Sequence, residues 1–307
     1  MAKLFNRFFN EEKGTVVIII ALAFVMLLGF VALSVDIGVL ALEKTRLSRT
    51  MDAIALAGAQ ELPNTSKAEA VAADYAERNG VDPGMVTVSF SADNKKITAT
   101  SDRVVNLYFA KALGFYTANV EGKASAIIVP VKEIGGLMPI GLNDNSLPLI
   151  EGQEYLIKAG AQDQTHGWRG IIKYPGAHGA QDYANYILNG YPGVIEIGDK
   201  EDEENGNVSG PTSDAVEERI EACNDGCVWS NYKSGCPRVA LVPIYHDLAP
   251  AKKVEISGYA TVFLERVPGS GNDSEVWARY IYNTVSGEAD ESESNYNKYL
   301  NTVRLSE

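Results

Sequence analysis

Three cysteines carry the most distinctive chemistry in the sequence. Cys223, Cys227 and Cys236 fall within 14 residues of one another. Thiolates bind zinc, but a structural zinc site takes four ligands, and no histidine lies in this window. A disulfide with one remaining thiol is the favoured interpretation, provided that the segment lies in an oxidising compartment. We expect the pair Cys227–Cys236, which closes a short loop, and Cys223 stays open as the alternative partner.

A run of acidic residues is the second candidate for chemistry. It includes Asp199, Glu201, Asp202 and Glu203. Carboxylate oxygens at this density are suitable ligands for calcium. The run lacks the spacing of an EF-hand loop, however, and acidic runs are usually solvated. We therefore expect an exposed loop, with calcium as the open alternative at these four residues.

The rest of the sequence offers no catalytic constellation. His166, His178 and His246 lie far apart and outside any zinc motif, and their convergence with Asp247 on a metal is left open. No phosphate-binding glycine loop and no nucleophile elbow is present. We therefore expect a protein that is not an enzyme and that needs no cofactor.

A long N-terminal helix is the element that must position everything else. Val16–Val35 contains no charged residue, and twenty helical residues are roughly 30 Å long, the thickness of the hydrocarbon core of a bilayer. The apolar core of a signal peptide has only about 7–15 residues. A membrane anchor that contacts the lipid bilayer through Val16–Val35 is favoured, and a signal removed near Ala32–Ser34 is the alternative.

An apolar stripe with helical spacing continues beyond this span. It includes Leu40, Leu47, Met51, Ile54 and Ala57, so a helix over residues 15–62 would be about 70 Å long. Small residues near its end allow another helix to approach closely. We expect the stripe to pack against other stalks or an assembly machine, which gives a homo-oligomer or filament. Leu47→Asp should then disrupt assembly and leave the remainder folded.

The downstream sequence predicts an α+β fold. Residues 63–130 are expected to form a small head, residues 131–140 a linker, and residues 141–307 a mostly antiparallel β domain, sandwich or barrel-like. In the head, the patterns predict a helix over residues 66–79 and a hairpin over residues 86–100. A second helix is predicted over residues 104–113, and a strand over residues 118–129. The aromatic residues of the second helix are expected in the core. Two helices, over residues 180–189 and 213–222, interrupt the β domain.

The charge is distributed unevenly. Residues 1–62 carry equal numbers of basic and acidic residues, so the net charge of −13 falls on residues 63–307. An acidic domain repels nucleic acid, which is therefore not an expected partner. Three basic residues precede the apolar span and three follow it, so the charge bias gives no orientation. The cysteines place the large downstream part outside, and residues 1–14 are then a cytoplasmic leader or tail.

Several segments resemble the TadG-like proteins of the Tad/Flp pilus-assembly system. The resemblance lies in a basic tail that ends in glycine, an apolar span, a "VDxG" motif and an alanine-rich helix, in segments Asn10–Leu22, Ser34–Leu40, Leu47–Ala59 and Asn106–Ala126. It covers about residues 10–129, and a looser likeness extends into the C-terminal region. It implies a non-enzymatic, single-pass protein of the bacterial envelope that serves pilus biogenesis or surface attachment, with its N-terminus inside and its head outside.

Two alternatives stay open beside this interpretation. The first is a filament-forming pilin-like subunit, because Gly14 and Thr15 stand directly before the apolar run, where prepilin peptidase substrates are cut in proteins that this segment resembles. The sequence departs from that pattern at Ile19, where pilins of this system usually carry glutamate. The second is a surface adhesin or binding module, which rests on the β-rich domain alone.

Overall fold

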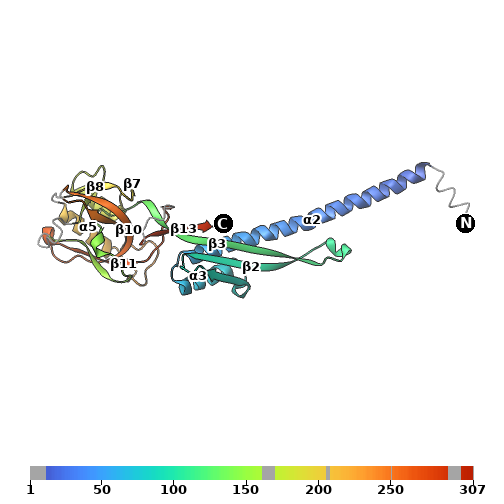
Figure 1. The fold of residues 1–307 in the computed structure, drawn as a ribbon, viewed down its shortest axis with the longest axis horizontal. Coiled ribbons are helices and arrows are strands. Elements are labelled where there is room, and N and C mark those ends of the chain that lie inside the picture. Colours follow the sequence, from blue (N-terminus) through green and yellow to red (C-terminus); the bar gives the residue numbers. More distant parts are fainter. Residues whose placement is uncertain (1–11, 161–169, 205–207, 250, 290–298, 307) are drawn as a thin grey trace, which may run out of the picture. The chain divides into compact units, whose positions relative to one another are not determined.

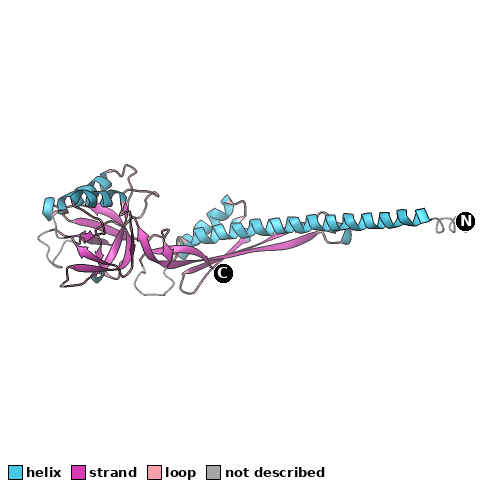
Figure 2. Cartoon of the chain, turned by 90° about the horizontal axis from the view of Figure 1, so that it is seen from above, coloured by secondary structure: helices cyan, strands magenta, loops and turns pink. Residues whose placement is uncertain are grey.

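The structure, a computed structural model, describes residues 12–160, 170–204, 208–249, 251–289 and 299–306 (Figure 1). The chain divides into two compact units. The first runs up to Ala126 and takes in the end of the chain from Leu305, and the second is Ile127–Arg304. Antiparallel sheets and helices occur in both units (Figure 2), which confirms the predicted α+β class.

Helix α2, Glu12–Ala59, is the largest element of the first unit. No proline interrupts these 48 residues, and leucine and alanine, both strong helix formers, are the commonest among them. Hydroxyl groups within the helix are satisfied locally, since Ser34 donates to the carbonyl of Phe30 at 2.8 Å and Thr45 to that of Ala41 at 2.9 Å. The long apolar helix predicted from periodicity is confirmed.

A second helix and a hairpin complete the first unit. Helix α3 is Thr65–Arg78. Asn64 caps its N-terminus, where the Asn64 side chain accepts a hydrogen bond from the Lys67 amide. Strands β1, Val86–Phe90, and β2, Lys96–Asn106, pair antiparallel, and β2 is followed by β3, Thr117–Gly135. The short 3-10 helices η1 and η2 are Pro83–Met85 and Ala110–Leu113. Strands β2 and β3 run along α2 (Figure 1).

The second unit is built on a mixed, mainly antiparallel sheet. Its strand order is β4-β9-β10-β11-β5. Strand β8 also pairs with β10, and β6 pairs with β8. Only the β4–β9 pair is parallel among those with a described register. Helices α4, Ala180–Asn189, and α5, Ser209–Glu221, pack together. The remaining elements are β4 Leu142–Asn143, η3 Asp144–Ser146, β5 Glu154–Lys158, β6 Ile172–Lys173, β7 Val194–Glu196, β8 Lys200–Glu203, β9 Val239–Asp247, β10 Lys253–Arg266, η4 Gly271–Asp273, β11 Val276–Ile281, β12 Glu288–Ala289 and β13 Asn301–Ser306.

Buried tyrosines are a prominent part of the core of the second unit. Tyr259 donates to the carbonyls of Lys132 and Ile195 at 3.1 and 2.7 Å, and Tyr174 donates to that of Met138 at 3.0 Å. The rings supply apolar surface while the hydroxyl groups satisfy buried backbone acceptors. Burial raises the pKa of the Tyr259 hydroxyl, which therefore remains protonated.

Two local predictions were wrong. The segment predicted as a helix over residues 104–113 instead continues β2 to Asn106 and has only the 3-10 turn η2, because its β-branched start pairs within the sheet. The segment predicted as a linker over residues 131–140 contains the end of β3, which pairs with β7 and β12. Leu137 and Met138 within it are fully buried.

Candidate functional site

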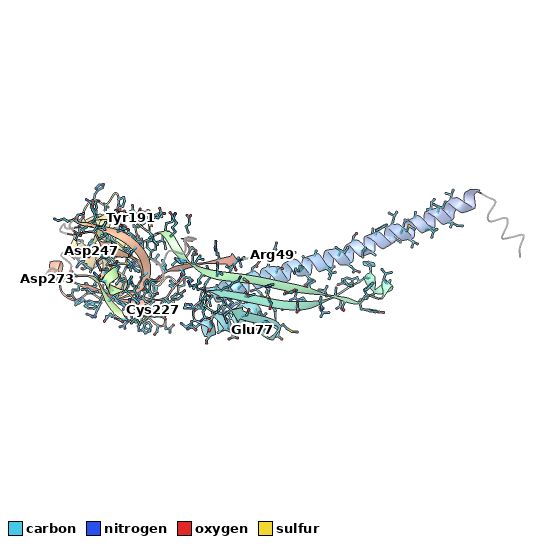
Figure 3. The ribbon with its side chains drawn as sticks, viewed as in Figure 1. Arg49, Glu77, Tyr191, Cys227, Asp247 and Asp273 are labelled. Carbon is cyan, nitrogen blue, oxygen red and sulfur yellow. The ribbon has the colours of Figure 1, made fainter. Side chains whose placement is uncertain are left out.

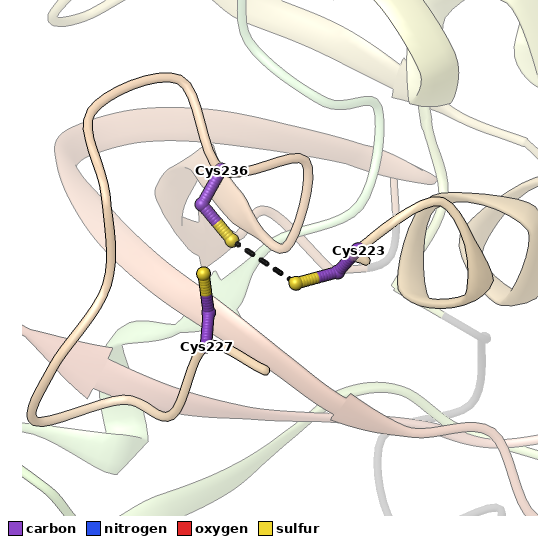
Figure 4. A group of neighbouring side chains, drawn as sticks. All are labelled: Cys223, Cys227 and Cys236. Carbon is purple, nitrogen blue, oxygen red and sulfur yellow. Dashed lines mark hydrogen bonds between the residues drawn. The ribbon is translucent and has the colours of Figure 1, made fainter. Parts of the chain in front are cut away.

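The three cysteines come together in the second unit (Figure 4), and Figure 3 marks the place of Cys227 in the chain. Their sulfur atoms all lie within 4.8 Å of one another, with Cys223 Sγ and Cys236 Sγ 3.7 Å apart. All three are free thiols in the structure. The arrangement brings either partner of Cys236 into range, so the pairing of Cys227 with Cys236 stays a prediction.

The cysteine environments differ chemically. Hydrogen bonds, the largest from the Cys227 backbone, lower the pKa of the Cys223 thiol, whereas burial raises the pKa of Cys236 to about 11. Cys223 is thus the readier thiolate nucleophile in disulfide formation. The cluster supplies three of the four ligands of a structural zinc site, and among the described residues no fourth cysteine, histidine or carboxylate belongs to the group.

The acidic run forms a strand and not the expected loop. Asp199 turns back to accept a hydrogen bond from the Glu196 amide at 2.8 Å, and β8 then pairs with β10. Successive side chains on a strand point to opposite faces, so these carboxylates do not converge. Asp202 forms an ion pair with Lys253 at 2.7 Å, and burial raises the pKa of Glu201. Within the described ranges, no acidic residue of β8 belongs to a three-ligand group.

The histidines do not assemble a site in the part of the chain that the structure describes. His246 Nδ1 lies 3.0 Å from Asp144 Oδ2, and Asp247 accepts from Asn143 at 2.7 Å. No described histidine belongs to a group of three metal ligands. His166 lies outside the described residues.

The contacts of two basic residues of the second unit, the partly buried Arg219 and the buried Lys158, have no signal in the sequence. Arg219 on α5 donates to the carbonyls of Pro237, Ile187 and Val239 at 2.6, 2.7 and 2.7 Å, so one guanidinium joins α4, β9 and the cysteine segment. The buried Lys158 donates to the Ser274 carbonyl. Their partners lie far away in the sequence, and an isolated basic residue gives no hint of them.

The predicted helix-packing stripe lies inside its own unit. Leu47, Met51, Ile54 and Ala57 are at most 5% exposed, and Leu40 is half-buried. They are covered by α3 and the sheet. This overturns the expectation that these residues face another chain: the stripe predicts burial correctly, but the partner is the chain itself.

Small residues explain how closely the elements approach α2. A Cβ atom on Gly58 would lie 2.5 Å from Ile97 Cδ1 and 3.2 Å from the Ala68 carbonyl oxygen. A Cβ atom on Gly122 would lie 2.6 Å from Leu47 Cγ. The small residues near the end of α2 do admit a second helix, as expected, and that helix is α3.

Polar contacts fix the C-terminal half of α2 to strands β2 and β3. Glu43 pairs with Arg103 on β2 at 3.1 Å and with Arg46 at 3.0 Å. The hydrogen bond from Arg103, followed by the effect of Arg46, lowers the pKa of Glu43. Lys44 donates to the Glu121 carbonyl on β3. The C-terminal half of α2 is therefore part of a folded head.

Asp36 makes the contact nearest to the apolar span. Its side chain is 2% exposed and accepts hydrogen bonds from the amides of Tyr108, Phe109 and Ala110 at 2.7, 3.0 and 2.6 Å. These amides open the turn η2, so a carboxylate 72 or more residues away caps it. From its place in the sequence, Asp36 would only mark the end of the span.

The N-terminal half of α2 is exposed and apolar. The large apolar side chains from Val16 to Val35 are 43–69% exposed. This segment belongs to a helix long and apolar enough to cross a membrane. Gly14 and Thr15 lie within α2, and processing between them stays a prediction.

Comparison with known families places this helix. Residues 14–61 match the Tad family, described as Putative Flp pilus-assembly TadE/G-like. We call residues 14–61 the Tad segment, because they are similar to this family. The resemblance inferred from the sequence is confirmed over this range. No curated protein and no solved structure matches the chain.

The Tad segment contains both halves of α2. Its first half is the exposed apolar span, and its second half is the core of the first unit. A Tad family match and an N-terminal apolar helix fit a membrane-anchored component of the cell envelope related to pili, in a family of assembly proteins and not of enzymes.

Proposed function

We propose that this protein is a membrane-anchored component of a Tad/Flp-like pilus-assembly or surface-attachment system. Val16–Val35 crosses the bilayer with the N-terminus inside, and the second unit is displayed outside. The observation that carries the proposal is the division of the Tad segment, whose exposed apolar half continues into the buried core of a folded unit. Such a helix anchors the head without a flexible joint.

Contacts with other subunits then involve the part of α2 that the head leaves uncovered. The buried stripe cannot serve, because α3 and the sheet occupy it. The exposed apolar residues are those of the span, together with Ile37 and Leu42 beyond it. Helix packing with pilus subunits or the assembly machine is accordingly expected along this uncovered face.

A pilin-like structural subunit is the second candidate function. It is favoured by the same exposed apolar half of α2, which could form the core of a filament, and by Gly14 before the apolar run. Isoleucine at position 19 counts against it, since pilins of this system usually have glutamate there. Cleavage after Gly14 distinguishes the two candidates.

The deciding experiment is intact mass spectrometry of the protein from membranes and from material sheared off the cell surface. Retention of the residues before Gly14, with the protein confined to membranes, is expected for a permanent anchor. A chain that starts at Thr15 in sheared filaments would establish the structural subunit instead, and a start near Val35 would identify a removed signal. Gly14→Leu should prevent only the chain that starts at Thr15. Gly29→Leu, on an open face of α2, is the matched control and should leave that processing unchanged.

A further inference from the structure

The tip of the β2–β3 hairpin is unusually apolar for an exposed turn. Leu107–Tyr116 contains five large apolar or aromatic side chains that are at least half exposed: Tyr108, Phe109, Leu113, Phe115 and Tyr116. Leu113 alone is 75% exposed. The β1–β2 turn of the same unit, Ser91–Lys95, has only small or polar residues. A concentrated exposed apolar patch marks a surface that contacts something other than water.

The tip and the membrane span together line one groove. This apolar groove of about 560 Å³ has Leu28, Val31 and Leu33 of α2 on one side and Phe109, Ala112 and Leu113 of the tip on the other. Leu28–Leu33 belongs to the uncharged run predicted to lie in the bilayer. The tip therefore reaches back along α2 to residues of the span.

Asp36 fixes the tip in this position. Its three hydrogen bonds to the amides at the start of η2 join the tip to α2 one residue after the span ends. Leu28 lies eight residues before Asp36, about 12 Å along the helix. The same contact satisfies a carboxylate and three amides that would otherwise be costly at the edge of a bilayer.

We propose that the hairpin tip is a second membrane contact, inserted into the outer interfacial layer of the bilayer beside the span. The occupant of the groove is lipid, because its α2 wall continues the lipid-facing surface of the anchor. Tyrosine and phenylalanine are suited to this layer, where their rings contact acyl chains and tyrosine hydroxyls reach water or headgroups. The α2 residues of the groove, Leu28–Leu33, lie about 3–10 Å before the end of the span at Val35. This depth is comparable with the roughly 5–10 Å by which interfacial elements enter a bilayer.

Charge at the tip supports lipid as the occupant. Lys111 is exposed within η2 and is the tip's basic residue. The Asp36 carboxylate accepts hydrogen bonds from three backbone amides of the tip and does not face the headgroups. A lysine at this level can extend toward phosphate groups. The tip thus presents no free carboxylate to the headgroups, although the chain as a whole carries a net charge of −13.

Tryptophan quenching by brominated lipids tests the proposal in the full-length protein. The natural tryptophans, Trp168, Trp229 and Trp277, all belong to the second unit, so they give a constant background. Leu113→Trp and Phe115→Trp place a probe at the tip, Lys95→Trp places one at the β1–β2 turn, and Phe30→Trp places one in the span. Each variant is reconstituted singly into nanodiscs of phosphatidylcholine and phosphatidylglycerol, with and without bromine on the acyl chains.

We expect bromine to reduce the added emission of both tip variants at least twofold, as for Phe30→Trp, and to leave Lys95→Trp unchanged. Tip emission quenched no more than that of Lys95→Trp would overturn the proposal. A blue-shifted but unquenched tip would also overturn it, since protein and not lipid would then cover the groove. Equal thermal unfolding of the variants and the parent chain verifies that the probes leave the head intact.

Discussion

Leu47 shows at the scale of one residue why an apolar stripe does not identify its partner. The residue is 1% exposed, and its Cγ atom faces the backbone at Gly122. The periodicity of α2 predicts that Leu47 is covered, but the covering strand lies about 75 residues further along the chain. Close packing of this kind leaves no space for another subunit at the same position.

Leu47→Asp should therefore destabilise the first unit and not merely disturb assembly. Removing a buried leucine side chain costs about 2–5 kcal/mol, and burying an unpaired carboxylate adds to this cost. We expect a loss above about 4 kcal/mol, measured by hydrogen exchange of the β2 amides. Leu42→Asp, on the 49% exposed neighbouring face, is the control and should leave exchange unchanged. Normal protection in Leu47→Asp would contradict the packing described.

Glu43 should make the stability of the first unit depend on acidic pH. The Arg103 guanidinium lowers the pKa of Glu43 below its usual 4.5, so the unfolded state binds a proton more readily than the folded state. The stabilising contribution is present above the unfolded pKa and is lost as the pH falls through the folded value. We expect Glu43→Gln to reduce the slope of stability between about pH 5 and 3. Arg103→Gln should reduce the slope in the same way, because it removes the partner that lowers the pKa of Glu43.

At the scale of elements, Arg219 connects parts of the second unit that are separate in the sequence. It donates hydrogen bonds to the carbonyls of Ile187 near the end of α4, of Pro237, and of Val239 at the start of β9. Partial burial lowers the pKa of this guanidinium from its ordinary value.

Arg219→Ala should cost the second unit about 3 kcal/mol, because three carbonyl groups lose a charged donor. Urea unfolding followed by tryptophan fluorescence measures the change, since the tryptophans belong to this unit. Glu217→Ala, on the exposed face of the same helix, is the matched control. An unchanged midpoint in Arg219→Ala would mean that water replaces the guanidinium at these carbonyls.

The elements that were predictable from the sequence are those with local causes. The uninterrupted apolar period of α2, the β1–β2 turn and the span of α4 all follow from neighbouring residues. The hairpin tip was misassigned because its aromatic spacing resembles a helix, whereas its structure depends on Asp36, far away in the sequence. The cysteine cluster and the contacts of Arg219 require the fold, and the acidic strand β8 is fixed by its pairing with β10.

At the scale of the whole molecule, the chain contains two units with separate cores. The first is organised around α2 and the second around the sheet that contains β10. Strand β3 contributes residues to both, so the connection between the units is continuous backbone in a strand. Domains with their own cores can unfold as separate cooperative transitions.

We expect two transitions in thermal or urea unfolding of the full-length protein. Tryptophan fluorescence should report the second unit alone, and exchange of the β2 amides should report the first. Leu47→Asp should then shift only the β2 transition, and Arg219→Ala only the fluorescence transition. A single coincident transition in both variants would show that the units unfold together.

The contacts at the two ends of the hairpin imply a rule of proportion between helix and strand. Along α2, Asp36 and Gly58 are separated by 22 residues, or about 33 Å. The positions that they touch on the hairpin, Tyr108 and Ile97, are separated by 11 residues, or about 36 Å. The hairpin therefore has about the same length as the part of α2 between Asp36 and Gly58. Four residues inserted into this part of α2 would lengthen it by about 6 Å and would require about two more in each strand, so length changes in related chains should occur in helix and hairpin together.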